Sequence, residues 1–320
     1  MLKVTDTNLV TTGYFGKLPK FADFVKYNAS GNEILTIDNW IQEGIRSAEL
    51  KYKNNWKNYY NNTSPIHFIF PFTGTDRITI GIICPSNDKS GRIFPFLIFG
   101  NMKQDLIKNL QVHLLPLNFK GYFDSITEVY KNNYSTEDLS EMKFQANNLS
   151  DSTISEKSAE NIYDNYLSDT SVERLFENTL MNSVDNNVHM VNDLFKNRIE
   201  IIEHSPAVKI NFDTRADYKL LDTCFYTQLL IKIFNRSNFF PAVYWNTIHE
   251  ELISLTLFFQ KPTPLNFLDL IYTDDESRND TNLEKGKEEN QAQDLSSIFK
   301  ENVTINNSHS LREFLNSFNT

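Results

Sequence analysis

Residues 66–99 read IHFIFPFTGTDRITIGIICPSNDKSGRIFPFLIF, and this stretch decides the fold. It contains three apolar runs, Ile66–Phe70, Arg77–Cys84 and Arg92–Phe99, whose β-branched and aromatic residues are typical of strands. Only residues 85–91 separate the second run from the third, which suits a hairpin better than a crossover helix. We therefore expect a sheet that is at least partly antiparallel. Because the runs are almost continuously apolar, they also predict that both faces of the sheet are covered.

Pro95 interrupts the third run. Proline has no N–H to donate to a sheet ladder, so this strand is expected either at an edge of the sheet or with a bulge at Pro95. Further along the chain, residues 207–212 alternate like a half-buried strand, and Pro241–Trp245 and Glu251–Phe259 are expected to pair as a hairpin.

Apolar spacing predicts the helices. A long helix is expected from Thr36, as its N-cap, to about Tyr60, because apolar residues recur there at intervals of three and four. A second helix, Asp217–Phe234, is apolar around so much of its circumference that it is expected in the core. A short helix is predicted over Pro264–Ile271.

These elements predict one α/β core over residues 10–272, built as a three-layer sandwich. Its mixed, largely antiparallel sheet would be covered by helices on both faces. Residues 132–165 are rich in Ser, Asp, Glu and Asn, and are expected to form a loop-rich insertion. Residues 273–320 predict an acidic, disordered linker followed by a short amphipathic tail.

Charge and apolar run length exclude several classes of function. The 320 residues include 31 Lys and Arg against 41 Asp and Glu, a net charge of −10, which disfavours binding to a nucleic acid. No apolar run approaches the ~18 residues that cross a bilayer, and no secretory signal is visible at the start. The two cysteines, Cys84 and Cys224, give no disulfide framework. We expect a cytoplasmic protein without direct membrane insertion.

Motifs for metal binding, nucleophilic catalysis and phosphate binding are missing from the sequence. The six histidines are isolated, and neither CxxC nor HExxH occurs. GxSxG and GxGxxG are absent as well. We therefore expect no metal, no cofactor and no catalytic residues. One enzymatic alternative stays open, in which His67, Asp88 and Arg92 form a dispersed active site.

Two clusters combine polar and aromatic residues. The first is Gly16-Lys17-Leu18-Pro19 followed by Asp23-Phe24, and the second is the loop PSNDKSGRIFP at 85–95. In the loop, Asp88 and Ser86 can accept backbone N–H groups, Gly91 can adopt a left-handed conformation, and Arg92 can fold back on Asp88. One interpretation is stabilisation of a hairpin loop. The other is an exposed face on which Lys17, Asp23, Asp88 and Arg92 meet a partner.

In this order, the clusters resemble the N-terminal signature of the type VI secretion-associated TagF family. That signature has a glycine, two aromatics and Gly-Lys-Leu-Pro, then Gly-Asp-Phe, a helix with a tryptophan, and a Pro-Ser-x-Asp-x-x-Gly-Arg-x-Phe-Pro loop. The corresponding segments here begin at Gly13, with Trp40 in the helix; Ala22 replaces the usual glycine before Asp23. The resemblance is strong over 13–102 and weaker over 224–272.

The resemblance implies a cytoplasmic, post-translational repressor of type VI secretion that is not an enzyme. It would act by binding a scaffold or a membrane-complex component, with the forkhead-associated scaffold protein as one candidate partner. An accessory structural or adaptor subunit is the alternative, and an α/β enzyme is a weaker one. The residues implied in partner binding or in the motifs are Gly16, Lys17, Leu18, Pro19, Asp23, Phe24, Trp40, Pro85, Ser86, Asp88, Gly91, Arg92, Phe94, Pro95 and Trp245.

Overall fold

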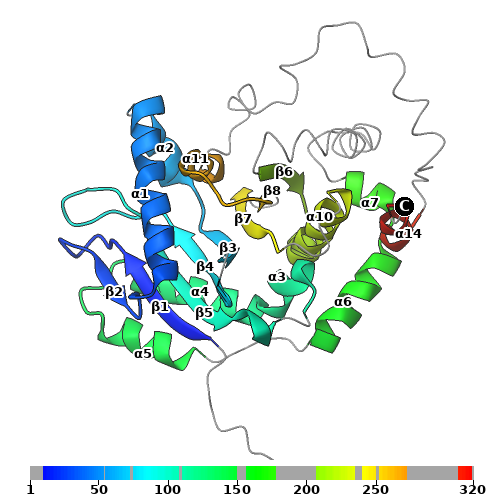
Figure 1. The fold of residues 1–320 in the computed structure, drawn as a ribbon, viewed down its shortest axis with the longest axis horizontal. Helices are drawn as coiled ribbons and strands as arrows, with labels where there is room; N and C mark the ends of the chain where they lie inside the picture. The colour runs from blue at the N-terminus through cyan, green and yellow to red at the C-terminus, as the bar shows by residue number, and fades with distance from the viewer. Residues whose placement is uncertain are drawn as a thin grey trace, which may run out of the picture.

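A computed structural model describes the protein over most of its length. The described ranges are 10–53, 55–72, 75–107, 110–149, 156–177, 207–234, 240–249, 252–271 and 309–318. At their centre lies one eight-stranded sheet in the order β2-β1-β5-β4-β3-β7-β8-β6. Helices cover both faces of this sheet (Figure 1), which confirms the predicted three-layer α/β sandwich.

Every strand pairing in the described residues is antiparallel. The strands are β1 (Thr11–Gly16), β2 (Val25–Tyr27), β3 (Ile66–Pro71), β4 (Arg77–Cys84), β5 (Phe96–Lys103), β6 (Ala207–Asp213), β7 (Ala242–His249) and β8 (Leu252–Phe258). The β4–β5 hairpin is confirmed, with pairs running from Arg77↔Lys103 to Cys84↔Phe96. The β7–β8 hairpin is confirmed as well.

The expectation for Pro95 was wrong. The strand β5 lies between β1 and β4, in the interior of the sheet, and it shows no bulge where it pairs with them. It begins at Phe96, one residue after the proline, so Pro95 never needs to donate to the ladder. The predicted strand residues Arg92–Phe94 instead belong to the loop, which is closed by a bridge between Asn87 and Ile93.

Three helices pack on one face of the sheet: α1 (Asn32–Tyr52), α2 (Trp56–Asn62) and α11 (Pro264–Ile271). The first two correct the single helix predicted from Thr36 to about Tyr60. The backbone of Lys53 has a φ of 50°, which ends α1 and starts a new direction for α2. Thr36 is not the N-cap either, since it lies inside α1, where its hydroxyl donates to the carbonyl of Asn32.

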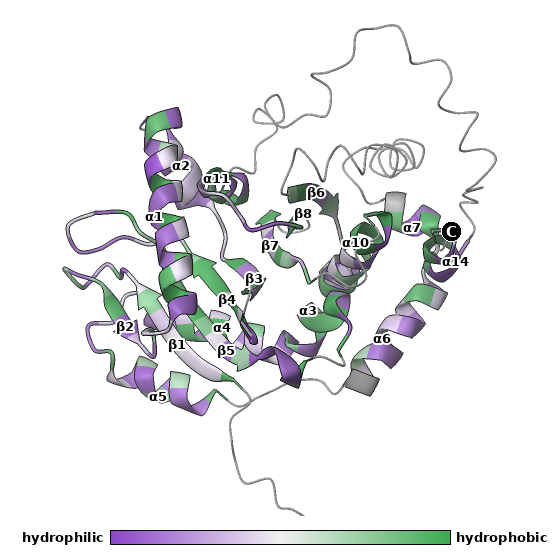
Figure 2. Cartoon of the chain, in the orientation of Figure 1, coloured by the Kyte–Doolittle hydropathy of each residue, from purple (hydrophilic) through white to green (hydrophobic). Residues whose placement is uncertain are grey.

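The second face carries the other α-helices that the structure describes. They are α3 (Leu115–Asn118), α4 (Lys120–Asn133), α5 (Ser140–Asn148), α6 (Glu156–Asp169), α7 (Val172–Glu177), α10 (Lys219–Ile233) and α14 (Leu311–Asn316). The predicted core position of α10 is confirmed, because most of its side chains are buried. Figure 2 shows hydrophilic residues along α1 and α5, whereas the strands at the centre of the sheet are largely hydrophobic.

One expectation about domain organisation needs correction. The segment 132–165 contains α5 and most of α6, with Met142 and Ala146 buried in the core, so it is not mainly loop. In the segment predicted as a short amphipathic tail, α14 buries Leu311, Phe314 and Leu315 in the same core as α10. The predicted disordered linker falls on 272–308, which lie outside the described residues.

Among the helices in the described ranges, none combines the length and the apolar character that a membrane crossing requires.

Candidate functional site

The two polar-aromatic clusters of the sequence meet at one end of the sheet. Gly16, at the end of β1, pairs with Phe96, at the start of β5. The segment that follows β1 therefore lies beside the loop that precedes β5. We call residues 16–24 and 85–95 together the two-loop platform. The backbone of one loop binds the other directly, since the N–H of Lys89 donates to the carbonyl of Phe21 over 2.8 Å.

Asp88 is the centre of the platform. Its Oδ2 accepts from Lys17 Nζ at 2.9 Å and from Arg92 Nε at 2.6 Å. Its Oδ1 accepts from the backbone N–H and the hydroxyl of Ser90 at 2.9 and 2.7 Å, and from the backbone N–H of Arg92 at 3.0 Å. A carboxylate has about four lone-pair sites, so these five donors occupy all of them. The predicted contact between Arg92 and Asp88 is confirmed.

This environment sets the charge of Asp88. Burial alone would raise the pKa of its carboxyl group, because the side chain is fully shielded from solvent. The hydrogen bonds from Ser90, Lys17 and Arg92 outweigh burial and hold that pKa well below its usual range. Asp88 is therefore a permanently ionised structural anchor, and its basicity is too low for a general base near neutral pH.

A second set of contacts joins the loops to the helix α2. The hydroxyl of Ser86 donates to the carbonyl of Lys17 at 2.7 Å. The backbone N–H of Ser86 donates to the hydroxyl of Tyr60 at 2.9 Å, and that hydroxyl donates to the carbonyl of Ser86 at 3.2 Å. Sequence reasoning missed Tyr60, which it treated only as the end of a helix. A tyrosine on an apolar helix face gives no sign that its hydroxyl will bind a loop 26 residues away.

Glycines are required at two points for different reasons. Gly16 has a φ of +136°, and a Cβ there would lie 2.2 Å from the carbonyl oxygen of Pro95. A side chain is therefore excluded both by conformation and by the close approach of the two loops. Gly91 has a φ of +82°, but a Cβ there would meet nothing within 4 Å. Its predicted left-handed conformation is confirmed, and only conformation favours glycine at that position.

The ring of Phe24 packs against two other phenylalanines, Phe15 of β1 and Phe94 of the second loop. The ring of Phe24 stacks on Phe15 with centroids 5.2 Å apart and meets the edge of Phe94 at 4.9 Å. Lys17 Nζ lies 5.2 Å from the centroid of the Phe24 ring, in cation–π geometry. Phe94 is buried, whereas Phe24 keeps 39% of its surface exposed. The apolar ring of Phe24 is thus held in position by its neighbours and remains partly exposed to solvent.

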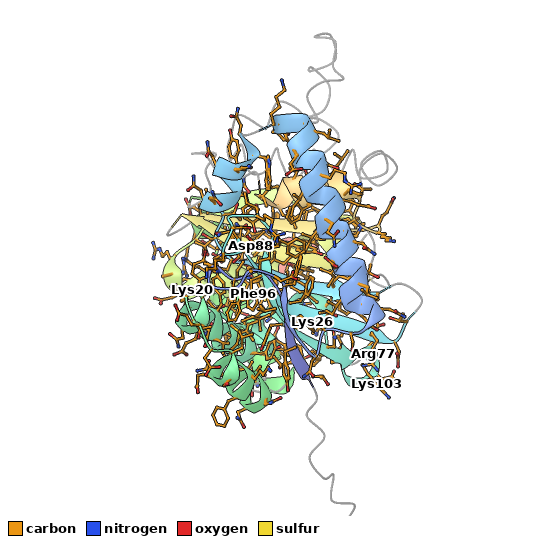
Figure 3. All side chains as sticks on the ribbon, turned by 90° about the vertical axis from the view of Figure 1, so that its left-hand side faces the viewer. Lys20, Lys26, Arg77, Asp88, Phe96 and Lys103 are labelled. Atoms are coloured by element: carbon orange, nitrogen blue, oxygen red, sulfur yellow. The ribbon has the colours of Figure 1, made fainter. Side chains whose placement is uncertain are left out.

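Most residues of the two motifs are internal. Lys17, Leu18, Ser86, Asp88, Phe94 and Pro95 are buried, and Pro19 and Pro85 are half-buried. Asp23, Phe24, Gly91 and Arg92 are exposed. Lys17 and Asp88 therefore fit the first interpretation, in which they stabilise the loops. Among the motif residues of the platform, only the exposed Asp23, Phe24, Gly91 and Arg92 can contact a partner. Figure 3 shows Asp88 among the side chains on this side of the molecule.

The two tryptophans that were assigned to the motifs from the sequence lie elsewhere in the core. Trp40, on α1, donates from Nε1 to the carbonyl of Thr263 at 2.7 Å and packs edge-on against Phe267 of α11. Trp245, on β7, stacks on His67 with centroids 5.2 Å apart and belongs to the core on the other face. Both are buried, so they support the fold and do not join the platform.

The dispersed active site suggested by the sequence is not assembled around Asp88. His67 lies on β3 between the rings of Trp245 and Phe123, and burial lowers its pKa to about 4. The side-chain partners of Asp88 are Lys17, Ser90 and Arg92, so His67 is not among them. Within the ranges that the structure describes, no group of three or more His, Cys, Asp or Glu side chains could hold a metal ion.

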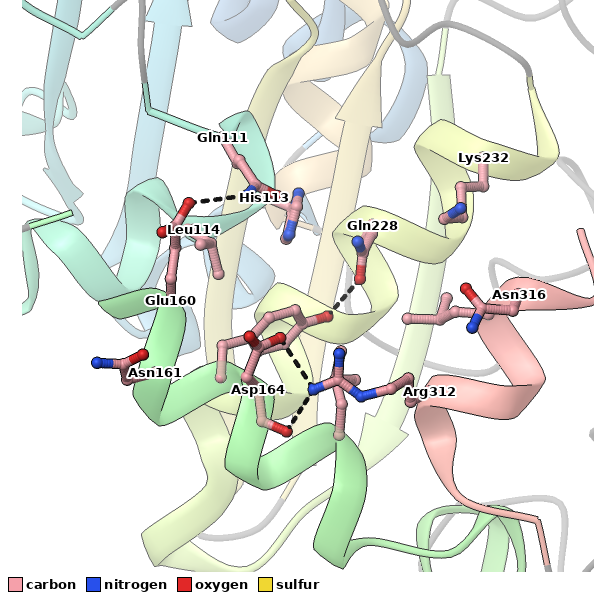
Figure 4. A pocket seen from close by; sticks show the side chains of 13 residues that line it. Gln111, His113, Leu114, Glu160, Asn161, Asp164, Gln228, Lys232, Arg312 and Asn316 are labelled. Carbon is pink, nitrogen blue, oxygen red and sulfur yellow. Dashed lines mark hydrogen bonds and ion pairs between the residues drawn. The ribbon is translucent and has the colours of Figure 1, made fainter. Parts of the chain in front are cut away.

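A polar cleft of about 350 Å³ lies on the other half of the molecule, between α6, α10 and α14 (Figure 4). Its polar groups largely bind one another. Arg312 pairs with Asp164 at 3.0 Å, Gln111 donates to Glu160 at 3.0 Å, and the hydroxyl of Tyr163 donates to Gln228 at 2.8 Å. These interactions engage six of the polar side chains that line the cleft.

Comparisons with known proteins find similarity over part of the chain. Residues 13–149 match the family described as the TagF N-terminal domain, Type VI secretion system-associated. No curated protein matches the sequence. A crystal structure of the protein PA0076 from Pseudomonas aeruginosa PAO1 is similar to 43% of this chain and 62% of its own, at 20% sequence identity and a TM-score of 0.39. The similarity thus spans less than two thirds of the length of that protein.

Proposed function

We propose that this chain, whose residues 13–149 form a TagF N-terminal domain associated with type VI secretion, represses that secretion by binding one of its components. The proposed target is a scaffold or a membrane-complex protein, with the forkhead-associated scaffold protein as the first candidate. Repression would be stoichiometric: the bound chain would occupy a surface that the apparatus needs for assembly. The protein would act in the cytoplasm and after translation.

The single observation that carries this proposal is the rigid presentation of Phe24. The matched residues 13–149 contain both loops of the platform, and the platform places this one exposed ring above a buried ion pair. An ordered aromatic side chain loses little conformational entropy on binding and is the typical anchor of a protein interface. A surface of this kind suits association with another protein.

The chemistry of the platform supports a role without catalysis. The five hydrogen bonds to Asp88 leave it no acceptor site for a substrate proton. The serine hydroxyls of the loop are engaged as well, since Ser86 donates to the carbonyl of Lys17 and Ser90 donates to the ionised carboxylate of Asp88. We therefore propose that the protein acts by binding and needs no cofactor.

Genetics in the native bacterium tests the proposal. Deletion of the gene should increase type VI secretion into the medium, and production of the chain from a plasmid should reduce it again. The amounts of the apparatus proteins should stay constant, because the proposed repression follows translation. Loss of secretion after deletion would contradict repression and would favour an adaptor subunit. Such a subunit should also co-sediment with the membrane complex while secretion is active.

A further inference from the structure

The charges around Phe24 point to the chemistry of its binding site. We propose that Phe24 inserts into an apolar pocket of its protein partner and that acidic side chains line the rim of that pocket. This inference rests on the proposed function, because it describes the partner surface that the two-loop platform would meet. Beyond the proposed function, it specifies which residues the partner should carry and which interactions should provide the affinity between the two proteins.

The exposed residues next to the ring are mainly cationic. Over 19–26 and 87–93 the exposed charged side chains are the cations Lys20, Lys26, Lys89 and Arg92 and the single anion Asp23. The whole chain carries a net charge of −10, so this local excess of positive charge runs against the composition. Figure 3 shows Lys20 and Lys26 on the side of the molecule that also carries Asp88.

The sheet pattern places one of these cations beside the ring. Lys26 pairs with Phe15 between β2 and β1, so the two side chains project from the same face of the sheet. Phe24, two residues before Lys26, stacks on the same Phe15 ring. The exposed ring and the Lys26 side chain are therefore neighbours on one surface.

The opposite loop provides the other cations. Arg92 donates from Nη2 to the carbonyl of Ala22 at 2.6 Å, which fixes its side chain beside the turn that leads to Phe24. The Arg92 side chain nevertheless keeps 62% of its surface exposed. Lys89 is exposed, and its backbone N–H binds the carbonyl of Phe21. Lys20 is 47% exposed and carries a surface ion pair with Glu137 at 3.2 Å, which water and salt weaken.

A protein with an acidic rim explains this surface better than an anionic membrane. Phe24, the one exposed aromatic ring of the two-loop platform, keeps 39% of its surface accessible and offers too little apolar area for stable insertion into lipid. A protein pocket needs only the ring as an anchor. Opposite charges around the pocket would speed association and fix the orientation, and salt would weaken their effect.

Binding of the full-length chain to purified secretion components tests the inference. The probes are the forkhead-associated scaffold protein and the cytoplasmic parts of the membrane-complex proteins, each titrated between about 50 and 500 mM salt. We expect one of them to bind with an affinity that falls as salt rises. Phe24→Ala should weaken binding about tenfold or more and leave the salt dependence unchanged. Phe24→Tyr should restore most of the affinity.

Charge-reversal variants distinguish the contribution of the acidic rim from that of the Phe24 ring. The double variant Lys20→Glu/Lys89→Glu should slow association about tenfold at low salt and flatten the salt dependence. The matched control is Lys103→Glu/Lys261→Glu, which changes the net charge equally at two exposed positions. Lys103 pairs with Arg77 at the end of β5 opposite to the platform, and Lys261 lies just before α11. The control should bind like the wild type, and thermal unfolding should show that all variants are folded.

The possible failures differ from one another. Binding by the wild type that is insensitive to salt, or equal effects of both charge-reversal variants, would overturn the acidic rim and leave the proposed function intact. Absence of binding to every component would overturn both. Sedimentation of the wild type with phosphatidylglycerol vesicles, lost in Phe24→Ala and in Lys20→Glu/Lys89→Glu, would identify the surface as a lipid-binding face and also overturn the inference.

Discussion

Lys17 and Asp88, 71 positions apart in the chain, form a buried ion pair with Nζ and Oδ2 2.9 Å apart. The exposed fractions of their side chains are only 8% and 0%. The pair connects the segment after β1 to the loop before β5. A buried ion pair is not in itself a large source of stability, but removal of one partner leaves an uncompensated charge in the interior. The pair thus favours one relative position of the two loops.

The coupling between these two residues can be measured. Lys17→Met and Asp88→Asn should each lower the free energy of unfolding, because the first takes one of two cationic partners from buried Asp88 and the second leaves buried Lys17 without its carboxylate. The double variant should be clearly more stable than the sum of the two losses predicts, since it removes both charges. Denaturant unfolding of the four proteins gives the coupling free energy. Additive losses would show that the ion pair does not connect the loops.

The stability that Asp88 provides should depend on pH in a defined direction. The folded state holds the pKa of its carboxyl below the unfolded value of about 3.9, so this stability is fully present above that pH. As the pH falls below about 4, the unfolded chain takes up a proton that the folded chain resists. The difference in stability between the wild type and Asp88→Asn should therefore shrink between about pH 4 and pH 2. A constant difference over this range would be inconsistent with a depressed pKa.

The two glycines with positive φ provide a matched pair of substitutions. Gly91→Ala should cost about 1 kcal/mol, because the added methyl group meets only an unfavourable backbone conformation. Gly16→Ala should cost about 3 kcal/mol or more, because the methyl group also collides with the backbone at Pro95 and Phe96. Thermal unfolding of the two variants ranks them directly. Equal losses would mean that the loops can separate at no cost.

The C-terminal helix α14 should contribute to stability through its apolar side. Phe314 is 2% exposed and packs against Phe225 and Phe318, so Phe314→Ala should cost about 3–5 kcal/mol. Arg312, on the same helix, forms an exposed ion pair with Asp164, and Arg312→Ala should cost about 1 kcal/mol or less. Denaturant unfolding compares the two. A small loss for Phe314→Ala would show that α14 leaves the core easily.

Local patterns predicted the strands β3 to β8 and the helices α10 and α11. The runs in 66–99 gave the β3–β4–β5 arrangement because alternation and turn residues are local signals. Other features depend on the backbone or on tertiary contacts. The positive φ of Lys53, which divides α1 from α2, has no sequence signal, because lysine rarely adopts that conformation. The helix α5 was missed because only Met142 and Ala146 of its nine residues are buried.

The sequence predicted which residues form the candidate site, but not which of them are buried. The sequence identified Lys17, Asp88 and Arg92 as related residues, and the structure brings them together. It did not reveal that Lys17 and Asp88 are buried, because burial depends on the pairing of β1 with β5. The docking of α14 is another case. Its apolar spacing was visible, but the surface on which it packs is formed by α6 and α10, which lie far earlier in the chain.

Secretion by a strain with a single substitution at Phe24 tests the central claim most directly. The claim is that the two-loop platform represses type VI secretion by presenting this ring to a partner. Phe24→Ala, placed in the chromosomal gene, should raise secretion toward the level of a deletion strain while the amount of the protein stays normal. Leu265→Ala, which truncates an exposed apolar side chain on α11, is the matched control and should leave secretion unchanged. Normal repression by a stable Phe24→Ala protein would contradict the claim.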